Sequence, residues 1–316
     1  MNASSNSTLA FVFPGQGSQS VGMLSGLAGR FPEVRACFDE ASSVLGLDLW
    51  DMTQEGPEAD LSRTVNTQPA MLAAGVAVWR VWQTQGGAPP VFMAGHSLGE
   101  YTALVCAGAL SFDDAIRLVA LRGRLMQDSV PEGVGAMSAI IGMSDDDVRQ
   151  LCLDAADGEV LEAVNFNAPG QVVIAGHSAA VERANLLARE RGARRALPLP
   201  VSVPSHCALM KDAAEQLRTE LDSVAIALPS VPVFHNVDAR PAGDVTAVRD
   251  ALYHQLYSAV RWVDTVRHIR EAGCETVIEA GPGKVLAGLC KRIDKSLTCL
   301  PVFDESSLGK ALTAPA

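Results

Sequence analysis

Apolar and polar residues follow one another along the chain in blocks that predict strands, turns and helices in alternation. Leu9 to Phe13 is a short apolar run that ends at Pro14-Gly15, as expected of a buried strand followed by a turn. Val91 to Ala94 is a second such run, and the residues from Glu100 to Ala107 predict a packed helix. Strands alternating with helices predict a parallel α/β sheet.

The stretch 132–203 follows a different rhythm. Strands are predicted over 136–142, 160–165, 171–175 and 196–203, and helices over 145–156 and 180–191. This β-α-β-β-α-β order is the split βαβ arrangement of ferredoxin-like units. We therefore predict a ferredoxin-like small domain at 132–203, inserted into a discontinuous catalytic domain formed by 1–131 and 204–316. Two later strands, near 231–237 and 276–279, are assigned to the larger domain.

Composition indicates an ordinary soluble globular protein. The chain has 316 residues, of which 48% are hydrophobic and 19% are charged. It contains no run of apolar residues long enough to span a membrane, and its first residues lack the features of a secretory signal. The 7 cysteines include no C-x-x-C pair, which favours reduced thiols in a cytoplasmic protein and argues against a zinc site.

The distribution of charge indicates which classes of partner the protein can bind. A formal net charge of −11 argues against nucleic acid, because binding phosphates requires clustered Lys and Arg. The segment 261–295 is an exception, with basic residues in slight excess over acidic ones. This segment is interpreted either as a solvated helix face or as part of a surface that binds an acidic partner.

The candidate chemistry centres on Gly95-His96-Ser97-Leu98-Gly99, a G-x-S-x-G pattern between the second strand and its helix. A serine on such a sharp turn is exposed above the sheet, and the helix N-terminus favours developing negative charge there. The alternative is a glycine-rich turn with an incidental serine. The strand before it and the helix after it favour the catalytic interpretation.

A serine nucleophile needs a base and an oxyanion hole. His206, in a loop at the return to the larger domain, is the first candidate base, and His235 is the second. His96 adjoins the serine and suits a pocket wall better than a base. The Leu98 amide and the loop Gly15-Gln16-Gly17 are candidate oxyanion donors, although that loop could equally be a plain turn. The sequence singles out no acid to orient the base.

Arg122 is the most informative residue outside this turn. At about 100° per residue, it falls in the middle of the apolar arc of its helix, whereas Arg117 and Arg124 fall on the polar side. A buried arginine is costly unless it is paired with an anion, and this helix offers no acid on the same face. Arg122 therefore pairs with a carboxylate elsewhere in the protein or with one on a substrate.

Neither glycine-rich segment predicts a nucleotide site. The segment 281–285 has Val285 where a phosphate-binding loop needs Ser or Thr. The loop at Gly15 has Ser20 where the dinucleotide fingerprint needs Gly or Ala. No nucleotide cofactor is expected.

Taken together and in order, the motifs of the chain resemble those of the malonyl-CoA:acyl carrier protein transacylases of bacterial fatty acid synthesis. The resemblance covers Phe11 to about Leu300 and rests on the segments 15–19, 95–100, 122–123, 204–206 and 281–283. It implies an α/β-hydrolase-like large domain with a ferredoxin-like insert, in agreement with the pattern above.

The resemblance also implies roles for single residues. Ser97 is the nucleophile and His206 the base, and the Gln16 and Leu98 amides form the oxyanion hole. Arg122 binds the malonyl carboxylate, and a carbonyl in the stretch that begins at Gln255 orients His206 in place of an acid. Asn165 lies on the insert side of the cleft, and His96 is a supporting residue.

The resemblance implies malonyl transfer from malonyl-CoA to acyl carrier protein by a ping-pong mechanism, with no metal and no cofactor beyond the two substrates. A cytoplasmic monomer is expected. The alternatives are a serine esterase or thioesterase and an acyltransferase that serves a polyketide synthase in trans. The sequence leaves open which carrier protein it uses and whether it accepts methylmalonyl or acetyl groups.

Overall fold

The structure is a computed structural model that describes residues 8–131, 133–201 and 203–314. Glu132, where the predicted insert begins, lies outside the described residues, as do Ser202 and the first residues, in which no secretory signal is predicted. The fold is α/β, as predicted, with one parallel and one antiparallel sheet.

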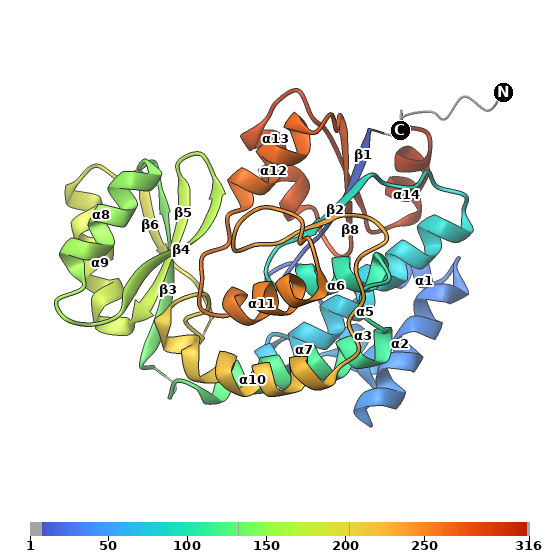
Figure 1. The fold of residues 1–316 in the computed structure, drawn as a ribbon, viewed down its shortest axis with the longest axis horizontal. Helices are drawn as coiled ribbons and strands as arrows, with labels where there is room; N and C mark the ends of the chain where they lie inside the picture. Colours follow the sequence, from blue (N-terminus) through green and yellow to red (C-terminus); the bar gives the residue numbers. More distant parts are fainter. Residues whose placement is uncertain (1–7, 132, 202, 315–316) are drawn as a thin grey trace.

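The parallel sheet has the strand order β7-β2-β1-β8-β9 and forms the centre of the larger part of the molecule (Figure 1). Its strands are β1 (Leu9–Phe13), β2 (Phe92–Gly95), β7 (Val233–Phe234), β8 (Thr276–Ala280) and β9 (Thr298–Val302). The strand predicted over 231–237 is real but much shorter. The sequence analysis missed β9, because its partly exposed side chains and Pro301 do not form an apolar run.

Helices cover both faces of this sheet (Figure 1). The N-terminal helices are α1 (Ser25–Ala28), α2 (Pro32–Leu45), α3 (Leu49–Glu55), α4 (Glu58–Leu61), α5 (Thr64–Thr84), α6 (Gly99–Cys106) and α7 (Phe112–Asp128). The C-terminal ones are α10 (Lys211–Ser223), preceded by a 3-10 turn at Ala208–Met210, then α11 (Val245–Gln255), α12 (Trp262–Glu271), α13 (Val285–Ile293) and α14 (Glu305–Leu312).

The core between β1 and α5 is aromatic. Phe11 meets Trp79 and Trp82 edge to face, with ring centroids 5.1 and 5.2 Å apart. Each such contact is worth about 0.5–1.5 kcal/mol beyond the area it buries. This packing anchors β1, whose carboxyl end leads into the loop at Gly15.

The antiparallel sheet lies to one side, with α8 (Asp145–Ala155) and α9 (Ser178–Glu190) packed together against it (Figure 1). Its strands are β3 (Gly135–Ile141), β4 (Leu161–Ala168), β5 (Gln171–His177) and β6 (Arg195–Pro198), in the order β4-β5-β3-β6. The element order is the predicted β-α-β-β-α-β. The assignment of 132–203 as a separate domain stays a prediction.

Two contacts place the candidate residues at one edge of the parallel sheet. Phe13 pairs with Gly95 in register, so the loops that follow β1 and β2 lie side by side. Asn165 of β4 forms a bridge with Val260, which brings the antiparallel sheet over that edge. Carboxyl ends of parallel strands are the usual place for a ligand site.

Candidate active site

The turn at Ser97 is a tight strand-to-helix junction between β2 and α6. Ser97 has a φ of 51°, in the left-handed region that a residue other than glycine rarely adopts. A Cβ on Gly95 would lie 1.8 Å from the Gly99 carbonyl carbon, and one on Gly99 would lie 2.0 Å from the Phe13 carbonyl oxygen. Only glycine fits at both flanking positions. The main chain therefore holds the serine in a strained conformation, a feature that clusters at functional sites.

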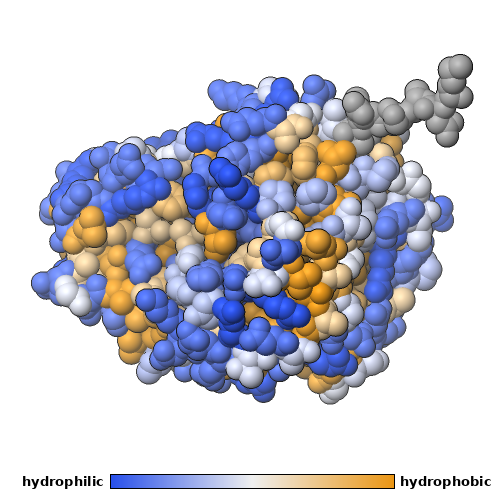
Figure 2. Space-filling model, in the orientation of Figure 1, coloured by the Kyte–Doolittle hydropathy of each residue, from blue (hydrophilic) through white to orange (hydrophobic). Residues whose placement is uncertain are grey.

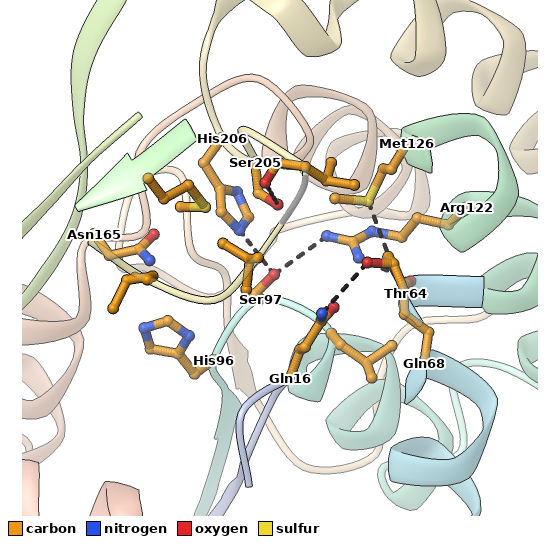
Figure 3. Close-up of a pocket in the computed structure, with 15 residues that line it drawn as sticks. Gln16, Thr64, Gln68, His96, Ser97, Arg122, Met126, Asn165, Ser205 and His206 are labelled. Atoms are coloured by element: carbon orange, nitrogen blue, oxygen red, sulfur yellow. Dashed lines mark hydrogen bonds between the residues drawn. The ribbon is translucent and has the colours of Figure 1, made fainter. Parts of the chain in front are cut away.

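The hydroxyl of Ser97 lies between a base and a cation (Figure 3). Its Oγ is 2.8 Å from His206 Nε2 and accepts a hydrogen bond of 3.3 Å from Arg122 Nη2. His206, with a φ of 67°, is likewise held in the left-handed region. The structure thus brings together a hydroxyl and an imidazole that are 109 residues apart in the sequence.

The hydrogen bond of the other ring nitrogen of His206, Nδ1, determines the tautomer of the imidazole. Nδ1 is 2.7 Å from the main-chain oxygen of Gln255, which can only accept, so Nδ1 carries the proton. In the neutral ring Nε2 is then free to accept a proton from Ser97. Burial and the charge of Arg122 lower the pKa of His206 to about 3. The imidazole is therefore neutral at physiological pH, so Nε2 keeps the lone pair that a base needs.

Arg122 on α7 is 1% exposed, as the position on its helix predicts. Its Nη1 donates to Gln68 Oε1 at 2.9 Å and its Nη2 to Gln255 Oε1 at 3.0 Å, both neutral acceptors. Its guanidinium also lies over the ring of Tyr101, 5.6 Å from the centroid. No carboxylate among the described residues forms an ion pair with it. Of the two alternatives for Arg122, an unpaired cation that faces the pocket favours a carboxylate on the substrate.

The candidate oxyanion donors lie next to the nucleophile. A Cβ on Gly15 would be 2.5 Å from the His96 carbonyl oxygen and 3.7 Å from the Leu98 nitrogen, so the loop after β1 packs directly on the turn. Neither the main-chain N–H of Gln16 nor that of Leu98 donates a hydrogen bond to another of the described residues, whereas the Gln16 side chain donates to Thr64 Oγ1. Both are thus available to a ligand.

His96 and Asn165 lie on the opposite wall of the pocket from Arg122 (Figure 3). His96 Nε2 is 2.8 Å from Asn167 Oδ1, and its ring packs against Trp262. Burial lowers the pKa of His96, against the opposing effect of the hydrogen bond to Asn167. The Oδ1 atom of Asn165 is buried and has no hydrogen-bond partner within the described ranges. Both residues fit a wall that contacts the substrate.

His235, the second candidate base, makes its side-chain contact with Glu100. Its Nδ1 is 2.7 Å from Glu100 Oε1, in a buried pair behind the nucleophile, whereas His206 contacts Ser97. The sequence analysis also missed Gln68, a ligand of Arg122, and Asn236, whose Oδ1 accepts from the Ser97 amide at 2.7 Å. No local motif marks any of these contacts.

A second cavity adjoins the pocket and shares Gln16, His96, Asn165, Leu199 and Val201 with it. It is lined further out by residues 15–19 and by Val285, Leu286 and Leu289 of α13. The second cavity thus lies between the pocket at Ser97 and α13.

Within the described residues, His, Cys, Asp and Glu side chains form no group of three that could hold a metal ion. Among the helices of the same residues, none has both the length and the apolar character that crossing a bilayer requires. All 7 cysteines are free.

Comparisons with known proteins bear directly on this site. The sequence profile of a family described as acyl transferase domain matches residues 10–309. A malonyl CoA-acyl carrier protein transacylase from Salmonella typhimurium is 57% identical over 304 residues, which cover 96% of this chain and 98% of that protein. The relative from Escherichia coli strain K12 has the same name and is 56% identical, with coverage of 96% and 98%.

Solved structures agree with the sequence relatives. The crystal structure of an acyl carrier protein S-malonyltransferase from Vibrio cholerae matches with a TM-score of 0.94 at 57% identity and covers 96% of this chain and 99% of that one. A malonyl-transacylase in complex with a type II polyketide synthase acyl carrier protein matches with a TM-score of 0.95 at 55% identity, covering 96% and 98%.

Proposed function

The chain belongs to the acyl transferase family, and from that premise we propose that it moves a malonyl group from malonyl-CoA to the phosphopantetheine thiol of acyl carrier protein, through an ester on Ser97. The proposal depends on one observation, the surroundings of Arg122. Its buried guanidinium has no carboxylate partner among the described residues and donates a hydrogen bond to the hydroxyl of Ser97. This arrangement favours an acyl group that has a carboxylate of its own.

In the first half-reaction, Ser97 Oγ attacks the thioester carbonyl carbon while its proton moves to His206 Nε2. The oxygen of the tetrahedral intermediate takes its negative charge between the main-chain N–H groups of Gln16 and Leu98, which would stabilise it by hydrogen bonds. When the carbon–sulfur bond breaks, His206 returns the proton to the sulfur of coenzyme A. The product is a malonyl ester of Ser97.

In the second half-reaction, the phosphopantetheine thiol of the carrier protein gives its proton to His206 and attacks the ester. The carbon–oxygen bond breaks, and Ser97 Oγ recovers the proton from His206. The main-chain oxygen of Gln255 keeps the proton of Nδ1 in place throughout, so no acidic residue is needed to orient the base.

Arg122 selects the acyl group. Arginine presents parallel N–H donors that fit both oxygens of a carboxylate, a geometry that lysine cannot copy. The guanidinium makes three hydrogen bonds to described residues, while its Nε has none. Two of the five N–H donors are thus left, one of them on the buried Nε, so a malonyl carboxylate beside the ester would bind at the terminal nitrogens, of which Nη2 contacts Ser97.

Initial-rate kinetics test this function. Double-reciprocal plots with malonyl-CoA and holo acyl carrier protein as the varied substrates are expected to be parallel, because coenzyme A leaves before the carrier protein reacts. Intersecting lines would indicate a ternary complex, and release of free malonate as fast as transfer would indicate the alternative thioesterase.

The relative whose structure contains a type II polyketide synthase carrier protein supports a second candidate function, supply of malonyl groups to a polyketide synthase in trans. Rates with fatty acid and polyketide carrier proteins, compared side by side, separate the two. The chemistry we propose requires no cofactor beyond the two substrates. A cytoplasmic, monomeric protein stays a prediction.

A further inference from the structure

A buried polar cluster lies behind the nucleophile, outside the pocket. It is formed by Glu100, His235, Asn236 and Gln255, and their side chains are almost fully buried. Glu100, three residues after Ser97 in the first turn of α6, is its centre. The Glu100 carboxylate accepts hydrogen bonds from His235 Nδ1 at 2.7 Å, from the main-chain N–H of Asn236 at 2.9 Å and from Gln255 Nε2 at 2.9 Å.

The charge of this carboxylate is compensated within the cluster. A buried carboxylate is costly unless it is paired and hydrogen-bonded. Burial lowers the pKa of His235, but the hydrogen bond to Glu100 and the Glu100 charge outweigh burial, so the pKa is raised overall. The Glu100 carboxylate is thus held in a buried hydrogen-bonded pair with His235, and it forms no ion pair with Arg122 among the described residues.

The cluster fixes the orientation of the Gln255 amide. Gln255 Nε2 donates to Glu100 Oε2 and to the Ser97 main-chain oxygen, both at 2.9 Å. Both partners only accept, so a flipped amide would place its oxygen against two acceptors. The amide oxygen must therefore face Arg122, to which it is bonded at 3.0 Å.

We propose that Glu100 is a positioning residue for the acyl-binding site: paired with His235, it locks the Gln255 amide, which in turn holds Arg122 in place beside Ser97. This inference rests on the proposed function, since it concerns how Arg122 recognises the malonyl carboxylate. Glu100 contacts no substrate and acts only through Gln255.

Gln68 supplies a matched comparison. It also accepts from Arg122, at 2.9 Å, but its own amide nitrogen donates to the weak acceptor Sδ of Met126 rather than to Glu100. Replacing Gln255 or Gln68 by methionine removes one hydrogen-bond acceptor of Arg122 in each case. Only the first replacement removes the connection to Glu100.

The experiment is a pair of double-mutant cycles, with the ratio of kcat/KM for malonyl-CoA to that for acetyl-CoA as the readout. Glu100→Gln keeps the shape of the side chain but turns the charged hydrogen bond to Gln255 into a neutral one, which is about half as strong. We expect the malonyl-to-acetyl ratio to fall about tenfold. The effects of Glu100→Gln and Gln255→Met should be strongly non-additive, and this coupling should exceed that between Glu100→Gln and Gln68→Met, because Gln68 is connected to Glu100 only through Arg122.

Glu100→Asp provides a second route if the glutamine variant does not fold. It keeps the charge beside His235 but is one methylene shorter, so its reach to Gln255 is lost, and the ratio is again expected to fall. An unchanged ratio in either folded variant, or additive effects in the Gln255 cycle, would overturn the inference. Absence of malonyl transfer by the unmodified enzyme would instead overturn the proposed function.

Discussion

Arg122 donates a hydrogen bond from Nη2 to the hydroxyl of Ser97 at 3.3 Å, so the cation that fits an acyl carboxylate is in contact with the atom that would carry the acyl group. This contact sets the spacing between the ester and the carboxylate of the bound acyl group. A malonyl group has its carboxylate one methylene from the reacting carbonyl, which suits such a short separation.

Removing the cation should therefore change which acyl group the enzyme prefers. For Arg122→Ala we expect malonyl transfer to fall by about two orders of magnitude or more, because a carboxylate would have to be buried without a partner. Acetyl transfer should persist or improve. Arg124→Ala, which removes an exposed arginine two residues along α7, is the control and should leave both rates unchanged. Equal losses for both acyl groups would mean that Arg122 has a structural role only.

The pH dependence of acylation tests the state of His206. An ordinary histidine, with a pKa of about 6.5, would cause activity to fall below that pH. Because burial and the Arg122 charge lower the pKa of His206 to about 3, we expect kcat/KM for acetyl-CoA to stay level down to about pH 5. Acetyl-CoA is chosen because its acyl group carries no carboxylate to titrate. A fall in rate centred near pH 6.5 would contradict the assignment.

The lowered pKa of His206 also makes the folded protein less stable as the pH falls. Below about pH 6.5 the unfolded chain binds a proton at His206 while the folded chain does not, so protonation favours unfolding. The contribution of neutral His206 is complete above that pH and is lost as the pH falls toward about 3. His206→Asn should accordingly weaken the acid dependence of the unfolding free energy.

The glycines of the turn give a prediction about stability. A methyl group on Gly99 would lie 2.0 Å from the Phe13 carbonyl oxygen, which belongs to a core strand and cannot move aside. We expect Gly99→Ala to lower the unfolding free energy by about 1–3 kcal/mol in denaturant titrations. Gly288→Ala, inside α13 with open space around it, is the control and should be neutral or stabilising. Equal stability of the two variants would be evidence against the tight turn.

The basic segment of the sequence analysis gives a prediction about the carrier protein. Lys291 and Arg292 are exposed on α13, whose residues Val285 and Leu289 line the outer cavity. The surface over α12 and α13 is mostly hydrophilic (Figure 2). Reversing both charges should raise the KM for an acidic carrier protein several-fold, without changing the KM for malonyl-CoA. Arg124→Glu on α7 is the matched control, and unchanged kinetics in the double variant would exclude this docking surface.

Local patterns predicted much of the fold and part of the site. The turn at Ser97 and the buried face of Arg122 follow from spacing over a few residues, which a sequence displays directly. The pairing of Glu100 with His235 joins residues 135 positions apart, and that of Arg122 with Gln68 joins residues 54 apart. Such contacts depend on how the strands and helices are arranged, so His235 could be mistaken for a base. The edge strand β9 is not apparent in the sequence because its side chains are mostly only partly buried and do not form an apolar run.

Intact-mass analysis after mixing with malonyl-CoA measures whether Ser97 carries a malonyl ester. We expect one malonyl group per chain, located on Ser97 by peptide mapping and absent from Ser97→Ala. Holo acyl carrier protein should discharge it much faster than water does. No adduct, or an adduct on another residue, would exclude Ser97 as the acyl carrier, and loss to water as fast as to the carrier protein would exclude a transferase.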